Sequence, residues 1–393
     1  MFTRPLKIGY FVLEGLNSFG TVYYFYYFYF YMQQVFGFGN KANLVLAALN
    51  GLVYALFSWQ AGRFAERAGY FTALRLGFVI MLGAWLTGSQ VESAGGQVVV
   101  MLVAVVGMCF TWPTLEALVS GGERRAGVQH MVGVYNVVWA ATGAVAYFIG
   151  GAGLEKGGLK SLFYVPAAIA ACQLALTLWL ETKARRSAPA GRLAPQAPAE
   201  PEQHPHPPAE VNRFLRMSWL ANPCAYVAIN TLVALMPGIA GRLGLSTMLA
   251  GFSGSVWCFA RLGAFWLFWV WAGWHYRFRW LFSAYLGLVS SFALILVVPS
   301  LAVLVAAQLV FGLAIGLIYY SSLFYSMDAS ETKGEHGGIH EAAIGLGNFA
   351  GPAVGAASLH FLPQHASSGA VAVTLLLLGG LAALGVIWRR NRP

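Results

Sequence analysis

The sequence predicts an all-α integral membrane protein with twelve transmembrane helices in two pseudo-symmetric six-helix bundles. Hydrophobic residues make up 58% of the 393 residues and charged residues only 10%. A soluble domain carries about 25% charged residues, so this composition excludes a soluble protein and a disordered chain. The apolar residues also form long runs with short connections, and one long polar stretch divides the runs into six and six.

Each apolar run is long enough to be a membrane span, because a hydrocarbon core about 30 Å thick needs about 20 apolar residues per helix. The first run follows Arg4 and Lys7 and continues to about Met32 without a small-residue cleavage site, so we interpret it as a retained span. The expected spans are 8–34, 43–61, 72–90, 97–120, 128–151, 160–181, 213–240, 247–272, 279–298, 301–326, 338–362 and 369–388.

The basic residues predict the orientation of these spans. With the N-terminus inside, 19 of the 24 Lys and Arg residues fall on the inside and 4 on the outside. Cytoplasmic loops concentrate Lys and Arg, so both termini are expected in the cytoplasm of a multi-pass protein of the plasma (inner) membrane. This distribution also accounts for the net charge of +10 without any nucleic-acid partner.

The polar stretch defines the predicted domains: residues 1–181 form an N-terminal bundle, 182–212 a cytoplasmic Pro-rich linker, and 213–393 a C-terminal bundle. Seven prolines and almost no large apolar side chain occur in 182–211, so this segment cannot bury a core. Small residues four apart in spans 128–151 and 338–362, at a shift of 205 residues, support a duplication of the two halves.

Metal sites and enzymatic motifs are not indicated. The four cysteines lie in apolar stretches without a CxxC pair, and Ile344 stands where an HExxH motif would need its second histidine. The linker histidines, His204 and His206, favour a solvated segment over a metal site, because two histidines alone make a poor ligand set. We therefore expect no enzyme, no metal and no cofactor.

The loop after the second span reads Gly62-Arg-Phe-Ala-Glu66-Arg67-Ala-Gly69-Tyr-Phe. It resembles the signature loop of the major facilitator superfamily, with Glu for the usual Asp and two aromatic residues in place of the final basic pair. Together with twelve spans and a long central loop, the resemblance covers the whole chain. It implies two bundles around a central cavity and solute transport by alternating access. It also implies that Glu341, at the start of span 338–362, lies near Arg67 in a cytoplasmic gate.

Arg261 lies 14 residues past Thr247, which places it about 21 Å along its span and near the middle of the membrane. A charge at this depth is costly and usually faces a cavity or a partner. Two interpretations stay open. Arg261 forms a structural pair with a carboxylate, or it contacts an anionic substrate.

Glu14 and Glu116 are the candidate carriers of a coupled proton, because both are carboxylates on spans that line the cavity in the resembled family. Burial beside apolar groups favours the protonated form of a carboxylate, as a proton carrier requires. The alternatives are a Glu14 side chain that reaches the cytoplasmic interface and a Glu116 paired with Arg124 or Arg125.

Polar and aromatic residues in the spans complete the candidate substrate site. Span 8–34 carries a run of tyrosines and phenylalanines longer than an interfacial aromatic belt, so some rings are expected to face the cavity. Helix packing is the alternative for all of them. With Arg261, the candidates are Asn17, Tyr27, Asn136, Trp139, Asn230, Tyr319 and Tyr320.

These observations predict a secondary active transporter that moves a small organic solute across the bilayer, coupled to protons and acting as a monomer. The alternative from another class is a membrane protein that binds without transporting, such as a sensor or a lipid scramblase. The identity of the solute, the coupling ion and the choice between efflux and uptake stay open.

Overall fold

The computed structural model describes residues 4–120, 125–187, 206–329 and 333–390, and these ranges fold into thirteen helices joined by short connections. The helices are α1 (Arg4–Phe36), α2 (Asn40–Ala68), α3 (Tyr70–Gly88), α4 (Ala94–Ser120), α5 (Arg125–Gly157), α6 (Ser161–Ser187), α7 (Pro208–Arg242), α8 (Thr247–Gly254), α9 (Val256–Val270), α10 (Phe278–Val297), α11 (Leu301–Ala329), α12 (Lys333–Phe361) and α13 (Ser368–Arg390).

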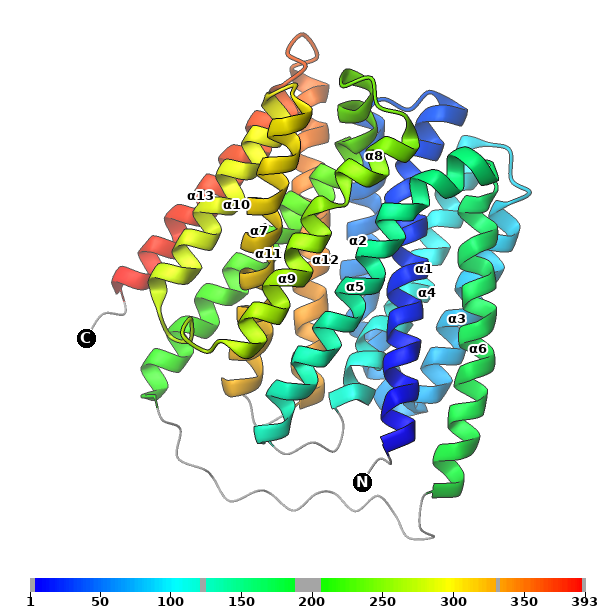
Figure 1. Cartoon of the computed structure of the whole chain (residues 1–393), viewed down its shortest axis with the longest axis vertical. Coiled ribbons are helices and arrows are strands. Elements are labelled where there is room, and N and C mark those ends of the chain that lie inside the picture. The colour runs from blue at the N-terminus through cyan, green and yellow to red at the C-terminus, as the bar shows by residue number, and fades with distance from the viewer. Residues whose placement is uncertain (1–3, 121–124, 188–205, 330–332, 391–393) are drawn as a thin grey trace.

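The helices form the two predicted bundles, α1–α6 and α7–α13, which stand side by side (Figure 1). The first bundle is built from contacts of α3 with α4 and α6 and of α1 with α5 and α6. The second is built from contacts of α11 with α9 and α10 and of α7 with α12. Helices α2 and α5 of the first bundle pack on α12 and α8 of the second.

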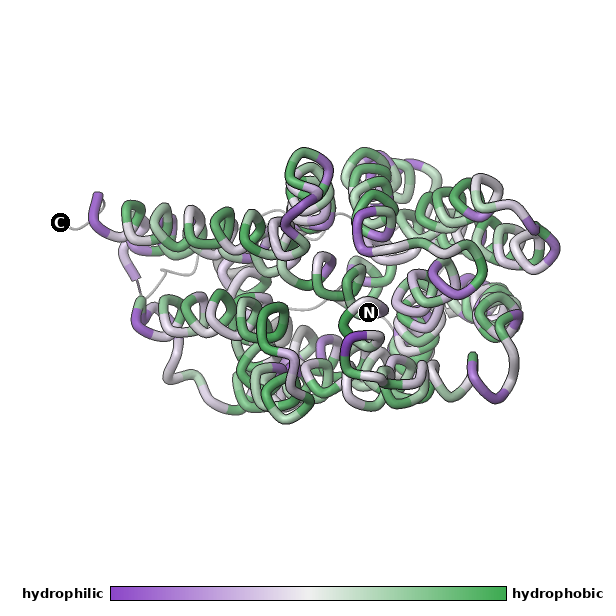
Figure 2. The backbone as a smooth tube through the Cα atoms, turned by 90° about the horizontal axis from the view of Figure 1, so that it is seen from above, coloured by the Kyte–Doolittle hydropathy of each residue, from purple (hydrophilic) through white to green (hydrophobic). Residues whose placement is uncertain are grey.

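The chain is a multi-pass membrane protein. Within the described ranges, eleven stretches are long and apolar enough to cross a membrane, with α8 and α9 counted together as one. The remaining helix, α1, has 33 residues, but its many tyrosines lower its hydropathy. Large apolar side chains such as Val297, Leu346 and Leu375 are more than half exposed, as expected for side chains that face lipid. Hydrophobic residues dominate the helices seen end-on, and hydrophilic ones gather toward the turns (Figure 2).

The side of the molecule where α1 begins is called the inner side here, and the side of the α1–α2 turn the outer side. The two bundles meet closely in the outer half. A Cβ atom on Gly51 of α2 would overlap the backbone of Asn348 on α12, and one on Gly151 of α5 would overlap the backbone of Thr247 on α8. Glu155 also accepts a hydrogen bond from the backbone N–H of Met248 at 2.9 Å. Small residues therefore let the halves touch backbone to backbone on the outer side.

Several segments differ from the expected boundaries. Helix α2 continues to Ala68 and α12 begins at Lys333. The predicted span 247–272 is interrupted at Ser255, between α8 and α9, and the carbonyl of Ser253 accepts a hydrogen bond from Gln308 Nε2 at 2.9 Å. This buried amide replaces a backbone donor at the break. The ends of the predicted linker 182–212 are helical, because α6 continues to Ser187 and α7 begins at Pro208. Its middle part, 188–205 with His204, lies outside the described residues.

Candidate functional site

Arg261 lies on α9, two turns past the break, and only 4% of it is exposed. Its guanidinium is stacked between two indoles, with Cζ 4.4 Å from the ring centre of Trp139 and 4.8 Å from that of Trp257. Its Nε has no hydrogen-bond partner, and no described carboxylate lies within ion-pair distance. The indole faces attract the cation but leave its N–H fork free to bind an anion. The expectation of a structural carboxylate pair is not met in the described part of the chain.

Three carboxylates lie within electrostatic range of one another: Glu14 on α1, Glu116 on α4 and Glu341 on α12. Glu14 is fully buried near the Tyr135 hydroxyl, and neither of its oxygens has a hydrogen-bond partner of normal geometry. Neither Glu14 nor Glu341 forms an ion pair with a described Lys or Arg. The first bundle contributes two members and the second bundle one, so the cluster joins the halves.

Glu341 does not contact Arg67, contrary to the prediction. It is 5% exposed and accepts a hydrogen bond from the Tyr54 hydroxyl of α2 at 2.5 Å, whereas Arg67 is exposed at the inner end of α2. The reason is position along the helix. Glu341 lies two turns into α12, opposite the middle of α2, so it cannot reach the loop.

The signature segment 62–71 forms the last turns of α2 and the start of α3, and Gly69 is the one residue of it between the two helices. Gly69 has φ +94°, a conformation that L side chains rarely adopt, and its N–H caps α2 by donating to the Ala65 carbonyl at 2.9 Å. A Cβ on Gly62 would meet no atom within 4 Å, and Glu66 and Arg67 are exposed. Among the four motif residues, backbone conformation therefore requires glycine at position 69.

An aromatic layer lies between Arg261 and the carboxylates. The Trp139 ring of α5 contacts Tyr319 of α11 and Phe265 of α9, both at 5.4 Å between ring centres. Tyr319 is within electrostatic range of all three carboxylates, and Tyr226 of α7 is within range of both Arg261 and Glu341. The layer contains rings from both halves, with Arg261 against Trp139 and the carboxylates in range of Tyr319.

The predicted amides fall into two groups. Asn17 is buried on α1 with no partner for either side-chain atom, and Asn136 accepts a hydrogen bond from Trp139 Nε1 at 3.0 Å while its own amide nitrogen has no partner. Asn230, by contrast, donates to Asn348 of α12 and so links α7 to α12. Asn17 and Asn136 therefore have side-chain atoms available for hydrogen bonds to a ligand, whereas the Asn230 amide nitrogen already donates to a neighbouring helix.

Of two further predicted tyrosines, Tyr27 lies away from the central layer and Tyr320 lies at its edge, with its ring centre 6.3 Å from that of Phe265. The Tyr27 hydroxyl donates to the Tyr147 carbonyl, and the ring fills the contact of α1 with α5. Tyr320 packs against Trp274 inside the second bundle, at 5.7 Å between ring centres. Their burial reflects helix packing, the alternative interpretation.

A cavity of about 130 Å³ lies between α7, α11 and α12, lined by Trp219, Asn222, Pro223, Ser322, His340 and Ala343. Asn222 has no partner for either side-chain atom, and His340 Nε2 has none either. Pro223 also removes the hydrogen bond that the Trp219 carbonyl would accept in a regular helix. The His340 ring contacts Tyr319 at 5.6 Å, so this cavity borders the aromatic layer.

Sequence reasoning missed Trp257, Tyr226, Tyr54 and Asn222. The spacing of Trp257 and Arg261 was a usable signal, because residues at i and i+4 share a helix face. The other three are single polar or aromatic residues in apolar spans, and only the packing of other helices places them beside the charged groups.

Comparisons with known proteins agree with this architecture. A point mutant of the nucleoside transporter NupG has a TM-score of 0.70 at 14% sequence identity, covering 99% of this chain and 100% of that chain. The human organic anion transporter MFSD10 (TETRAN) has a TM-score of 0.68 at 14% identity, covering 98% and 99%. These likenesses establish a shared fold.

No curated protein sequence matches this chain. The sequence model of the Major Facilitator Superfamily matches residues 123–352. This range contains more than half of the chain and extends from the first bundle into the second. The protein therefore belongs to the Major Facilitator Superfamily.

Proposed function

We propose that the protein is a secondary active transporter that moves a small organic solute by alternating access, with Arg261 as the anchor for an anionic group of that solute. The observation that carries this proposal is a buried guanidinium with free N–H groups and no described carboxylate partner. A charge kept in a membrane span without compensation costs at least about 2.5–3.5 kcal/mol. An anionic ligand would offset that cost. One structural relative is described as an organic anion transporter, which is consistent with this chemistry.

The aromatic layer is the proposed contact for the body of the solute. Trp139 belongs to the first bundle and Phe265 and Tyr319 to the second, so movement of the halves would separate these rings and expose their flat faces. Asn17 and Asn136 have hydrogen-bonding atoms to spare at the same place. Asn230 has one amide oxygen left for a ligand, whereas Tyr27 and Tyr320 are proposed only to support the site.

Proton coupling is assigned to Glu14 or Glu116. Both are within electrostatic range of the Glu341 carboxylate of the other bundle. A proton on the cluster would weaken the repulsion between the halves. Protonation would thereby change the free-energy difference between the inward-open and outward-open states.

The proposed topology places the inner side in the cytoplasm of the plasma (inner) membrane, with both termini there and the signature-loop residues Glu66 and Arg67 at the cytoplasmic gate. A cysteine introduced at Gly191, in a background without the four native cysteines, tests it. An impermeant thiol reagent should label this site only after the cells are opened. Labelling of intact cells would contradict the topology.

Counterflow in proteoliposomes tests the transport function. Ligands are first identified by their stabilisation of the purified protein, because a ligand that binds only the folded state raises its melting temperature. Vesicles loaded with unlabelled ligand should then take up labelled ligand by exchange, and Arg261→Ala vesicles should not. Binding without exchange would favour the sensor alternative, and lipid movement without solute exchange would favour a scramblase.

A further inference from the structure

The centre of the protein contains two poles of opposite charge that are not paired with each other. The basic pole is Arg261, on α9 of the second bundle. The acidic pole consists of Glu14, Glu116 and Glu341. In the described ranges, no ion pair of 4.0 Å or less joins Arg261 to these carboxylates.

The separation of the poles is built into the packing. Two indoles enclose the guanidinium, and the ring of Trp139 continues into Tyr319, which is in range of the carboxylates. Tyr226 lies in range of both poles. The rings of Trp139 and Tyr319 thus connect the guanidinium to the neighbourhood of the carboxylates.

Unsatisfied polar groups accompany each pole. Arg261 Nε, both oxygens of Glu14 and both side-chain atoms of Asn17 are buried without a hydrogen-bond partner. Asn17 lies three residues after Glu14, so the two share one face of α1. Buried polar groups in native proteins are nearly always hydrogen-bonded, so the orphaned atoms of Glu14 and Asn17 are available to a ligand that satisfies them.

We propose that the transported solute is a dipolar organic ion with a flat ring. Its anionic group binds the Arg261 fork, its ring lies on Trp139 and Tyr319, and its cationic group binds the carboxylates. This inference rests on the proposed function and specifies its substrate class. A plain anion would satisfy Arg261 and leave the orphaned oxygens of Glu14 without a donor. A cationic group donates to these oxygens, and the tyrosine faces beside them attract a cation as well.

The arrangement also explains why the acidic pole draws residues from both bundles. A solute that spans from Arg261 on α9 to Glu14 on α1 contacts both halves at once. Binding of such a solute favours the state in which the halves close around it, which a ligand held by one bundle alone would not do.

Matched ligands on the wild-type protein test this proposal without relying on a variant. The probes are flat zwitterions whose two charges lie at opposite ends of a ring, 4-(aminomethyl)benzoate and 4-(aminomethyl)phenylacetate among them, each with its N-acetyl derivative (lacking the ammonium) and its methyl ester (lacking the carboxylate). Binding is measured by thermal shift and calorimetry. At least one zwitterion should bind at least about tenfold more tightly than both of its derivatives. Absence of binding by every zwitterion would overturn the proposal, as would an N-acetyl derivative that binds as tightly as its parent.

Two substitutions then assign the poles for the zwitterion that binds. Glu14→Gln should reduce the preference for the zwitterion over its N-acetyl derivative, and Arg261→Lys should reduce its preference over the methyl ester. Unchanged preferences in both folded variants would contradict the assignment. The failure of this inference can be distinguished from the failure of the proposed function. If an N-acetyl anion binds best and is exchanged in an Arg261-dependent manner, the dipolar substrate is wrong and the transport function stands. If a zwitterion binds through both poles but is not exchanged, the transport function is wrong and the dipolar ligand stands.

Discussion

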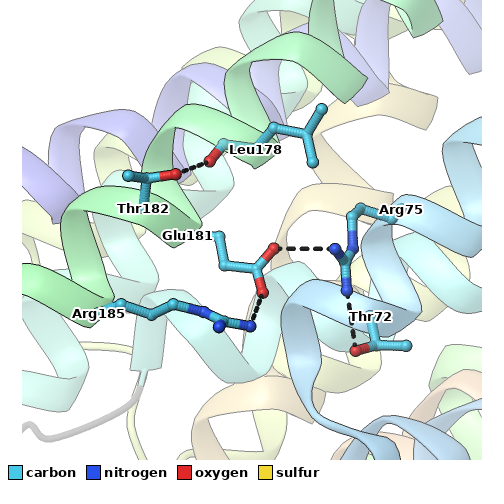
Figure 3. Close-up of polar contacts among 6 residues, drawn as sticks. All are labelled: Thr72, Arg75, Leu178, Glu181, Thr182 and Arg185. Carbon is cyan, nitrogen blue, oxygen red and sulfur yellow. Dashed lines mark hydrogen bonds and ion pairs between the residues drawn. The ribbon is translucent and has the colours of Figure 1, made fainter.

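Buried or half-buried carboxylates occur in this protein in two very different settings. At the inner end of α6, Glu181 is held by Arg75 of α3 at 3.2 Å and by Arg185 at 2.8 Å, and Arg75 is in turn close to the Thr72 hydroxyl at 3.3 Å (Figure 3). At the centre, Glu14 is fully buried without such a partner, and Arg261 is equally without one.

The charges around Glu181 stabilise the ligand-free fold, whereas we expect the central charges to bind a ligand. The residues around Glu181 compensate one another, so nothing further is needed there. Arg261 is compensated only in part, by two indole faces, and Glu341 by one tyrosine hydroxyl. Removal of a central charge should therefore affect function more than stability, and removal of a Glu181 partner should do the opposite.

The largest expected effect is the loss of gradient-driven accumulation when the carboxylate that carries the proton is neutralised. Of Glu14→Gln and Glu116→Gln, at least one should abolish pH-driven uptake into proteoliposomes and keep counterflow at saturating ligand. Glu181→Gln serves as the matched control, because it removes a carboxylate that lies at the inner end of α6 and outside the proposed site. Normal pH-driven accumulation by both central variants would eliminate the pair.

Replacement of the central cation should weaken ligand binding. A hydrogen bond to a charged group contributes about 1.5–3 kcal/mol, so Arg261→Ala should raise the Kd about 10- to 150-fold. Arg261→Lys keeps the charge without the planar fork and should fall between Ala and the wild type. Calorimetry with the best ligand measures both, and equal affinity in all three proteins would remove Arg261 from the site.

Tyr54→Phe makes Glu341 resemble Glu14, because it removes the hydroxyl that donates to this buried carboxylate. An unsatisfied buried acceptor costs about 1–3 kcal/mol, so the free energy of unfolding should fall by that amount. Tyr24→Phe is the control, since the Tyr24 hydroxyl is buried without a partner and its loss should be neutral or stabilising. The comparison fails if both variants melt at the same temperature.

The smallest effect on stability is expected at Glu181, at the inner end of α6. The side chain of Arg75 is 37% exposed, so its ion pair with Glu181 resembles a surface pair. Such pairs contribute about 0.2–1 kcal/mol. Glu181→Gln should therefore lower the melting temperature slightly and leave counterflow unchanged, and a loss of exchange here would undermine the contrast between the two regions.

The bundle architecture, the spans and the central position of Arg261 were accessible from the sequence, because hydrophobic length and basic residues determine how a chain crosses a bilayer. The state of Arg261 was not. Whether a guanidinium meets a carboxylate depends on side chains from other helices, and here the partners are Trp139 and Trp257.

The predicted contact of Glu341 with Arg67 failed for a related reason. The predicted span began at residue 338, whereas α12 begins at Lys333, so Glu341 lies inside the helix and not at its start. The register of α12 against α2, which close glycine contacts determine, was not accessible from the sequence either. Asn230 illustrates the same limit, since the amide that bonds to it, Asn348, lies 118 residues further along the chain.

The stability of ligand-free Arg261→Met tests the central claim most directly. The buried charge costs about 2.5–3.5 kcal/mol, and each indole returns about 0.5–2 kcal/mol, so the charge adds little or nothing to the stability of the empty protein. The melting temperature of purified Arg261→Met should equal or exceed that of the wild type, while counterflow is lost. A melting temperature lowered as far as that of Tyr54→Phe, with exchange intact in the folded fraction, would show that Arg261 is a structural residue and contradict the account.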